Sequence, residues 1–182
     1  SLISEELEFL DMPNVSFIVS RNETALNENG ADEIEFLISA NAGEEPKPLA
    51  KIASGGELSR VMLALKTVLA SSDTIETLVF DEIDTGIGGE IAVSVGAHLR
   101  NLAKKCQVLC ITHLASIAVY ADNQMKIEKS VTSNITNTKV FSITGKQRIE
   151  EVARMLSGDS VSQASLDHAE SMLLKFGKTG GI

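Results

Sequence analysis

Two short apolar runs, separated by one helical pattern, constrain the fold of this chain most strongly. The first run is TLVFDE at 77–82 and the second is QVLCIT at 107–112. Between them the spacing predicts a helix over about 89–104. The inner stripe of this helix comprises Ile91, Val95, Leu99 and Leu102. A buried strand, a helix and a second buried strand are the unit of a parallel sheet, so the pattern predicts an α/β fold.

The other elements follow from alternation and helical periodicity. They are antiparallel strands at 15–20 and 32–39 around a turn-rich segment, a Gly/Pro loop at 41–50, a helix over about 54–70, a short helix at 114–122, a closing hairpin formed by QMKIEKS and NTKVFSI, and helices over about 146–157 and 161–176. Their predicted apolar stripes are Leu58, Val61, Met62, Leu65, Val68 and Leu69, then Ile149, Val152, Ala153 and Leu156, then Ala169, Met172, Leu173 and Phe176.

Composition limits the classes of protein to consider. With 182 residues, 43% of them hydrophobic, the chain is long enough for one domain with a core. A net charge of −9 makes it a poor general clamp for DNA, because phosphate contacts come from Lys and Arg. We expect neither a signal peptide nor a membrane segment, and two cysteines make no disulfide framework. A cytoplasmic setting is therefore expected.

A pair of glycines stands at the start of the predicted helix, in Ser54-Gly55-Gly56-Glu57. Ser54 and Glu57 have the spacing of a capping box, which explains those two residues without explaining the glycines. Glycine is unfavourable in a helix unless something must approach the backbone closely. The glycines therefore favour either an anion contact at free backbone N–H groups or an ordinary cap after a flexible loop.

Carboxylates follow the first buried strand. Asp81 and Glu82 end the run and Asp84 comes two residues later, at the edge of an α/β sheet where ligands bind. Asp81 suits Mg²⁺, which prefers oxygen ligands and shares them with nucleotide phosphates. Glu82 could polarise a water molecule for attack. The alternative is a solvated acidic strand end before a Gly-rich turn.

His113 ends the second buried strand. If the two strands are neighbours, His113 lies close to the carboxylates, where an imidazole could hold a terminal phosphate or the attacking water. His98 and His168 are interpreted as structural, because each falls on a predicted helix without a carboxylate cluster nearby in sequence.

Two other features resemble functional motifs without meeting their requirements. Cys106 and Cys110 have no zinc-ligand spacing with partners, so we interpret them as buried thiols. The stretch from Gly177 to Thr179 ends like a phosphate-binding loop, but Met172 stands where the first glycine is required. The chain is therefore expected to lack a phosphate-cradling loop.

Taken together, these motifs resemble those of ABC-type ATPases. SGGE at a helix start is similar to the signature motif, FDE at a strand end to Walker B, and His113 to the H-loop. FDEID resembles the SMC-like DNA-repair branch more than transporters, which usually carry proline after the glutamate. ASGGELSRVMLALK, FDEIDTGIGG, ITHLASIAVYAD and RIEEVARML are similar to strings in one family of bacterial DNA repair proteins within that branch.

The resemblance implies a fold and a domain organisation. It implies a P-loop NTPase-like α/β fold: the C-terminal lobe of an ABC/SMC-type ATPase head, with parallel strands, flanking helices and small antiparallel strands. Residues 1–182 would form one such lobe. The Walker A lobe and the coiled coil would lie elsewhere in the parent protein.

The resemblance also implies site residues. Ser54, Gly55 and Gly56 would contact the γ-phosphate of ATP held by the opposite head, with Glu57 supporting the turn. Asp81 would hold Mg²⁺ through water, Glu82 would be the general base, and His113 would sense the γ-phosphate. The residues of the D-loop at the dimer seam would be Asp84, Thr85, Gly86, Ile87 and Gly88.

The implied function is ATP-dependent head dimerisation and hydrolysis, coupled to DNA binding or bridging in double-strand-break repair and recombination. ATP and Mg²⁺ would be required, and the isolated chain would be inactive. The implied partners are the protein's own N-terminal Walker A lobe, a second head as a homodimer, and DNA, in a cytoplasmic, nucleoid-associated setting without a membrane. The alternatives are a non-catalytic interaction lobe, or an ABC ATPase half from a transporter or another SMC-type protein.

Overall fold

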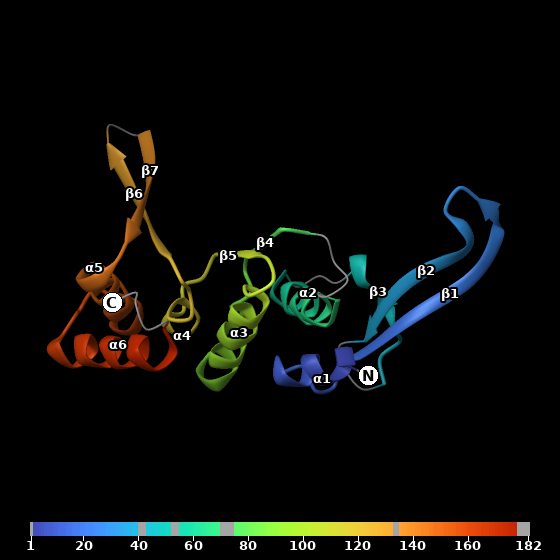
Figure 1. Ribbon diagram of the computed structural model, residues 1–182, viewed down its shortest axis with the longest axis horizontal. Coiled ribbons are helices and arrows are strands. Elements are labelled where there is room, and N and C mark those ends of the chain that lie inside the picture. The colour runs from blue at the N-terminus through green and yellow to red at the C-terminus, as the bar shows by residue number, and fades with distance from the viewer. Residues whose placement is uncertain (1, 40–42, 52–54, 70–74, 133–134, 178–182) are drawn as a thin grey trace. The chain divides into compact units, whose positions relative to one another are not determined.

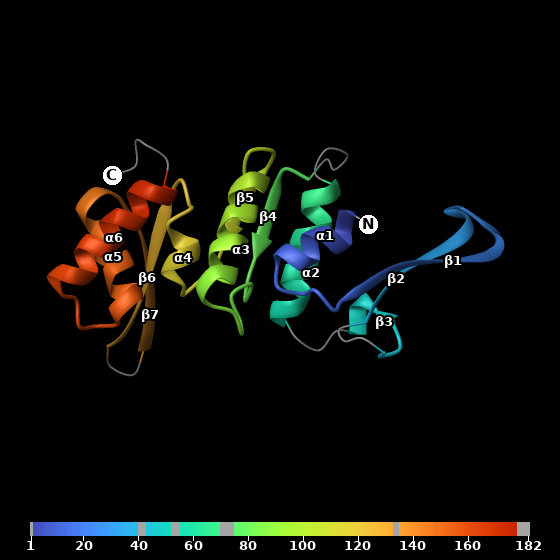
Figure 2. The same cartoon turned by 90° about the horizontal axis from the view of Figure 1, so that it is seen from below.

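The computed structural model describes residues 2–39, 43–51, 55–69, 75–132 and 135–177. The chain separates into two compact units. Figures 1 and 2 show the elements of both units as ribbons in two views. The first unit comprises Ser1–Ile87 and Asn101–Ile111, and the second comprises Gly88–Arg100 and Thr112–Ile182. Within the described ranges, no helix is both long and apolar enough to span a bilayer.

The first unit contains helices and two small sheets. Its elements are α1 (Leu2–Phe9), β1 (Ser16–Asn27), β2 (Gly30–Ser39), β3 (Lys47–Pro48), a 3₁₀ turn (Leu49–Lys51), α2 (Gly55–Leu69), β4 (Thr77–Phe80) and β5 (Gln107–Cys110). α1 was not predicted from the sequence. The expected loop at 41–50 contains the short strand β3, which pairs with β2.

β1 and β2 form a long antiparallel ribbon, seen in Figure 1. The predicted strands at 15–20 and 32–39 are confirmed, with Ser16 opposite Ser39. The turn-rich segment predicted between them is wrong for most of its length, because β1 continues to Asn27 and β2 begins at Gly30. The polar residues there belong to a ribbon that is exposed on both faces, so they do not mark a loop.

β4 and β5 run side by side as a parallel pair, as Figure 2 shows. The predicted βαβ order is thus confirmed, with Thr77 opposite Gln107. The prediction that these strands are buried on both faces is wrong. Val79 and Leu109, which pair with each other, are 64% and 41% exposed, and Ile111 is 52% exposed. One face of the pair therefore presents apolar side chains to solvent.

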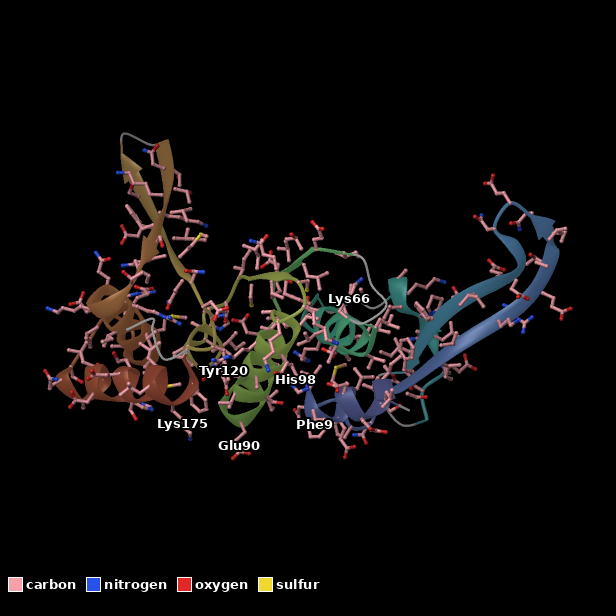
Figure 3. All side chains as sticks on the ribbon, viewed as in Figure 1. Phe9, Lys66, Glu90, His98, Tyr120 and Lys175 are labelled. Carbon is pink, nitrogen blue, oxygen red and sulfur yellow. The ribbon has the colours of Figure 1, made fainter. Side chains whose placement is uncertain are left out.

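α2 supplies much of the core of the first unit. The predicted helix is confirmed over Gly55–Leu69, while its predicted end residues 54 and 70 lie outside the described residues. Val61 and Leu65 of the predicted stripe are buried. Leu69 at its end is exposed, since the buried side also includes Leu63 and Ala64. α1 packs against α2, as seen in Figure 2. Lys66, labelled in Figure 3, lies in the last turn of α2, where the helix dipole favours a positive charge.

The second unit contains helices and a β-hairpin. Its elements are α3 (Gly89–Leu102, whose last two residues fall in the first unit), α4 (Ala115–Ala118), β6 (Gln124–Thr132), β7 (Ile135–Ile143), α5 (Gly145–Ser157) and α6 (Gln163–Phe176). The closing hairpin and the two last helices are confirmed. The helix expected at 114–122 is a single turn. The buried core of this unit is formed by Ala115, Val119, Val152, Ala153, Ala169 and Leu173.

Tyr120 connects several elements of the second unit. A Cβ atom added at Gly96 of α3 would collide with the Tyr120 ring, so the glycine makes room for it. The Tyr120 ring, labelled in Figure 3, lies 5.1 Å from the Phe176 ring of α6. Arg100 donates a hydrogen bond to the Phe176 carbonyl. α3 is therefore held to the end of α6 by both apolar and polar contacts.

Arg148 of α5 is the main buried cation of the second unit, 4% exposed. Its Nε donates to the Gln124 side chain at 3.2 Å, and its Nη2 donates to the carbonyl oxygens of Ala121 at 2.7 Å and Ala118 at 3.4 Å. Burial lowers the pKa of Arg148, while Asp122 acts in the opposite direction. Arg148 thus joins α5 to the end of α4 and the start of β6.

Candidate functional site

The acidic residues predicted to carry the chemistry follow β4 directly. Asp81 and Glu82 are exposed, whereas Asp84 is only 4% exposed. The strand ends at Phe80, so the sheet delivers these carboxylates to its C-terminal edge. We call residues 81–85 the acidic turn.

Glu82 has an unusual backbone conformation. Its φ angle is +57°, in the left-handed region that few residues other than glycine adopt. Its N–H donates to Asp81 Oδ1 at 2.9 Å, and its carbonyl accepts a hydrogen bond from the Thr85 N–H at 3.1 Å. Such a conformation costs on the order of 1–3 kcal/mol and persists only when its surroundings hold it.

The start of α2 lies directly against the acidic turn. A Cβ atom at Gly56 would lie 3.0 Å from the Thr85 carbonyl oxygen and 3.2 Å from the Glu82 carbonyl oxygen. A Cβ atom at Gly55 would collide with the Glu82 carboxylate. The glycine pair therefore has a reason within its own chain: it allows the first turn of the helix to touch the backbone and carboxylate that follow β4.

Two side chains one turn further along α2 also hold the acidic turn. Ser59 Oγ donates to the Asp81 carbonyl at 2.8 Å, and Arg60 Nη1 donates to the Thr85 carbonyl at 3.2 Å. Arg60 is 8% exposed. Burial lowers its pKa, whereas Glu57 and Asp11 raise it. Neither Ser59 nor Arg60 was predicted from the sequence, although an arginine between the apolar positions of a core helix is a signal that could have identified Arg60.

The acidic turn affects Cys110 at the end of β5. Burial, then the charges of Asp84 and Asp81, raises the pKa of the Cys110 thiol to about 12. Cys106 and Cys110 are free thiols, but the prediction that they are buried is wrong, because both are only half-buried. A thiol with so high a pKa is protonated near neutral pH and is a poor nucleophile.

The chain offers no complete metal cage among the residues that the structure describes. Among these described residues, no group of three or more His, Cys, Asp or Glu side chains lies close enough together to bind one metal ion. Asp81 is exposed and has one carboxylate oxygen fixed by the Glu82 N–H. An oxygen donor of this kind fits Mg²⁺, which is commonly held by one or two carboxylates together with water and substrate phosphates.

The remaining predicted site residues are placed as follows. Ser54 lies outside the described residues, so the capping box that it would form with Glu57 stays a prediction. Glu57 lies in the first turn of α2. Thr85 and Gly86 are exposed, and Gly86 has a φ of +76°. His113 is exposed and belongs to the second unit, so its approach to Asp81 and Glu82 also stays a prediction.

Gly56→Ala should destabilise this chain by roughly 1–3 kcal/mol, because the added methyl group meets backbone atoms that cannot rotate away. Urea unfolding of the isolated chain measures the change. Gly88→Ala is the matched control, since a Cβ atom at Gly88 has no neighbour within 4 Å. Equal stability of the two variants would contradict a tight contact between α2 and the acidic turn.

Cys110 should react with alkylating agents at a rate that keeps rising up to a pH of about 12, where its thiol ionises. The rate constant is measured against pH in a Cys106→Ala background. Asp84→Asn removes the neighbouring charge that raises the Cys110 pKa more than Asp81 does, and it should move the rise to lower pH. The sign of the effect on stability follows: the unfolded thiol ionises first, so folding becomes less favourable as pH rises towards 12. A rate that levels off near pH 9, the ordinary thiol value, would contradict this environment.

The chain is similar in sequence to several DNA repair proteins named RecN. No family model matches the chain. It is 59% identical over 144 residues to the DNA repair protein RecN of Treponema pallidum, covering 79% of this chain and 25% of that protein. It is 40% identical over 176 residues to RecN of Halalkalibacterium halodurans, covering 94% and 31%, and 51% identical over 144 residues to RecN of Deinococcus radiodurans, covering 79% and 25%.

The chain thus spans between a quarter and a third of the length of these relatives. Among solved structures, the Smc head domain with a coiled coil and joint from Pyrococcus yayanosii superimposes with a TM-score of 0.56 at 20% sequence identity. The match covers 86% of this chain and 28% of that one. This likeness shows the fold, which is the mixed α/β arrangement of an SMC head.

Proposed function

Because the chain belongs to the RecN family of DNA repair proteins, over the part of them that it spans, we propose that it is the C-terminal lobe of an ATP-hydrolysing head. The parent protein, meaning the full-length protein that contains this chain, would use ATP-dependent head dimerisation and hydrolysis to control DNA binding or bridging in double-strand-break repair. One observation carries the proposal: carboxylates at a strand end are held against a glycine-rich helix start.

Each site residue has a role in this proposal. Glu82 is the general base that takes a proton from the attacking water. Asp81 would hold Mg²⁺ through water, and the metal ion would supply positive charge beside the nucleotide phosphates. The start of α2, with Ser54, Gly55 and Gly56, contacts the γ-phosphate of ATP held by a second head. His113 senses the γ-phosphate, and residues 84–86 lie at the seam between heads.

The exposed apolar face of β4 and β5 supports a half-site that another lobe completes. Strands of a parallel sheet are normally covered on both faces, yet Val79, Leu109 and Ile111 are open to solvent in this chain. We propose that the Walker A lobe of the parent protein supplies the missing cover and the phosphate-binding loop. The isolated chain would then bind and hydrolyse ATP poorly or not at all.

Asp81→Asn in the parent protein should raise the Mg²⁺ concentration needed for half-maximal ATP turnover by roughly 10- to 100-fold, the usual cost of losing an outer contact to a metal ion. Turnover is measured by phosphate release over a magnesium titration. Glu76→Gln is the control, because Glu76 is an exposed carboxylate that directly precedes the first residue of β4, at the end of the strand away from Asp81. An unchanged magnesium dependence in Asp81→Asn would contradict the assigned role.

A further inference from the structure

The contacts between α2 and the acidic turn extend beyond the assigned site. We infer that Ser59 and Arg60 are positioning residues for Glu82: they couple the start of α2 to the direction of the Glu82 carboxylate within one chain. The inference rests on the proposed function, because it takes Glu82 as the general base.

Glu82 needs support from outside its own turn. Its left-handed backbone is unfavourable for a residue with a side chain. The local hydrogen bonds, from its own N–H to Asp81 and from the Thr85 N–H to its carbonyl, close the turn. They leave the position of the whole turn relative to the rest of the unit unspecified, and packing must set it.

One face of α2 provides this support. Gly55, Gly56, Ser59 and Arg60 are spaced so that they share one side of the helix. Ser59 holds the carbonyl just before Glu82, and Arg60 holds the carbonyl of Thr85, three residues after it. The turn is therefore fixed at both of its ends by hydroxyl and guanidinium donors from the same helix.

The Glu82 carboxylate itself also contacts the start of α2. Because Gly55 has no side chain, the Glu82 carboxylate lies directly against the first residue of α2. The carbonyl oxygens of Glu82 and Thr85 approach Gly56 closely. Any shift of the helix start is thereby transmitted to Glu82 by steric contact at 55–56 and by hydrogen bonds at 59–60.

Loss of this support should therefore slow the reaction and leave nucleotide affinity nearly unchanged. A displacement on the order of 1 Å can cost up to about 10²-fold in rate when it misaligns a reacting group. Ser59 and Arg60 donate to backbone carbonyls of their own chain, so their loss should affect kcat much more than KM. A residue with a purely structural role would instead change the stability of the fold.

The test uses steady-state ATP hydrolysis by the parent protein. Ser59→Ala should lower kcat by roughly tenfold with KM changed by less than about twofold, because the acidic turn loses one of its two supports. Ser59→Thr keeps the hydroxyl group and should restore most of kcat. Arg60→Lys keeps the positive charge but loses the planar guanidinium group, so it should also lower kcat.

Thr67→Val is the matched control. Thr67 Oγ1 also donates to a carbonyl, that of Leu63 at 2.8 Å, but this bond is internal to α2. Thr67→Val should therefore leave kcat unchanged. If Ser59→Ala and Thr67→Val have the same kcat, the inference is wrong.

Glu82→Gln, measured alongside, separates failure of the inference from failure of the function. Turnover that collapses in Glu82→Gln but stays normal in Ser59→Ala would remove the positioning role and keep the ATPase assignment. Normal turnover in Glu82→Gln would overturn the assignment on which the inference rests.

Discussion

Replacing Glu82 with glutamine in the parent protein should lower ATP turnover by roughly 10²- to 10⁴-fold, the usual contribution of a general base. Glutamine keeps the shape of the side chain that lies against Gly55 but cannot accept a proton at neutral pH. Nucleotide binding should persist, so ATP-bound dimers should accumulate. Phosphate release and light scattering measure the two effects.

Glu76→Gln again provides the control, because it also removes an exposed carboxylate, one that precedes β4 instead of following it. It should leave both turnover and dimerisation unchanged. Turnover within about twofold of the unmodified protein in Glu82→Gln would exclude Glu82 as the base, since general bases contribute far more than that.

Arg148→Met should destabilise the second unit by about 3 kcal/mol or more. Methionine nearly fills the space of the side chain but leaves the Gln124, Ala118 and Ala121 oxygens without their buried donor. Chemical unfolding, followed by hydrogen exchange at amides of α4 and α5, assigns the loss to this unit.

Lys146→Met on the same helix is the matched control. Lys146 pairs with Glu150 at 3.6 Å on the exposed surface, and such pairs contribute about 0–1 kcal/mol. A loss of stability in Arg148→Met no larger than that of the control would show that the hydrogen bonds of Arg148 do not connect α4, β6 and α5 as described.

The elements with strong periodicity were predictable from the sequence. The apolar runs that became β4 and β5, the helical stripe of α2, and the hairpin of β6 and β7 each carry a pattern that one kind of element satisfies. The parallel pairing of β4 with β5 also follows, because the intervening segment is helical.

Features that depend on packing between elements were not predictable. The ribbon of β1 and β2 extends through polar residues because both of its faces are exposed, which a pattern based on one buried face cannot reveal. The open face of β4 and β5 was missed for a related reason: apolar residues signal burial, and they do not say whether the covering layer lies in the same chain.

At the candidate site, the sequence located the residue types but not their arrangement. Asp81 and Glu82 stand where predicted, at the end of β4. Ser59 and Arg60 donate hydrogen bonds to residues more than twenty positions away in the sequence, so these bonds could not be predicted from local patterns. The left-handed conformation of Glu82, in the turn that they hold, was not predicted either. The glycine pair was recognised as a point of close approach, while the same-chain partner became visible only in the structure.

Calorimetric titration of Mg-ATP tests the central claim, that this chain is one half of a nucleotide site, most directly. The titration is made into the chain alone and then into its mixture with the Walker A lobe of the parent protein. We predict no measurable binding to the chain alone and binding in the mixture. Tight binding by the chain alone, or none in the mixture, would contradict the half-site.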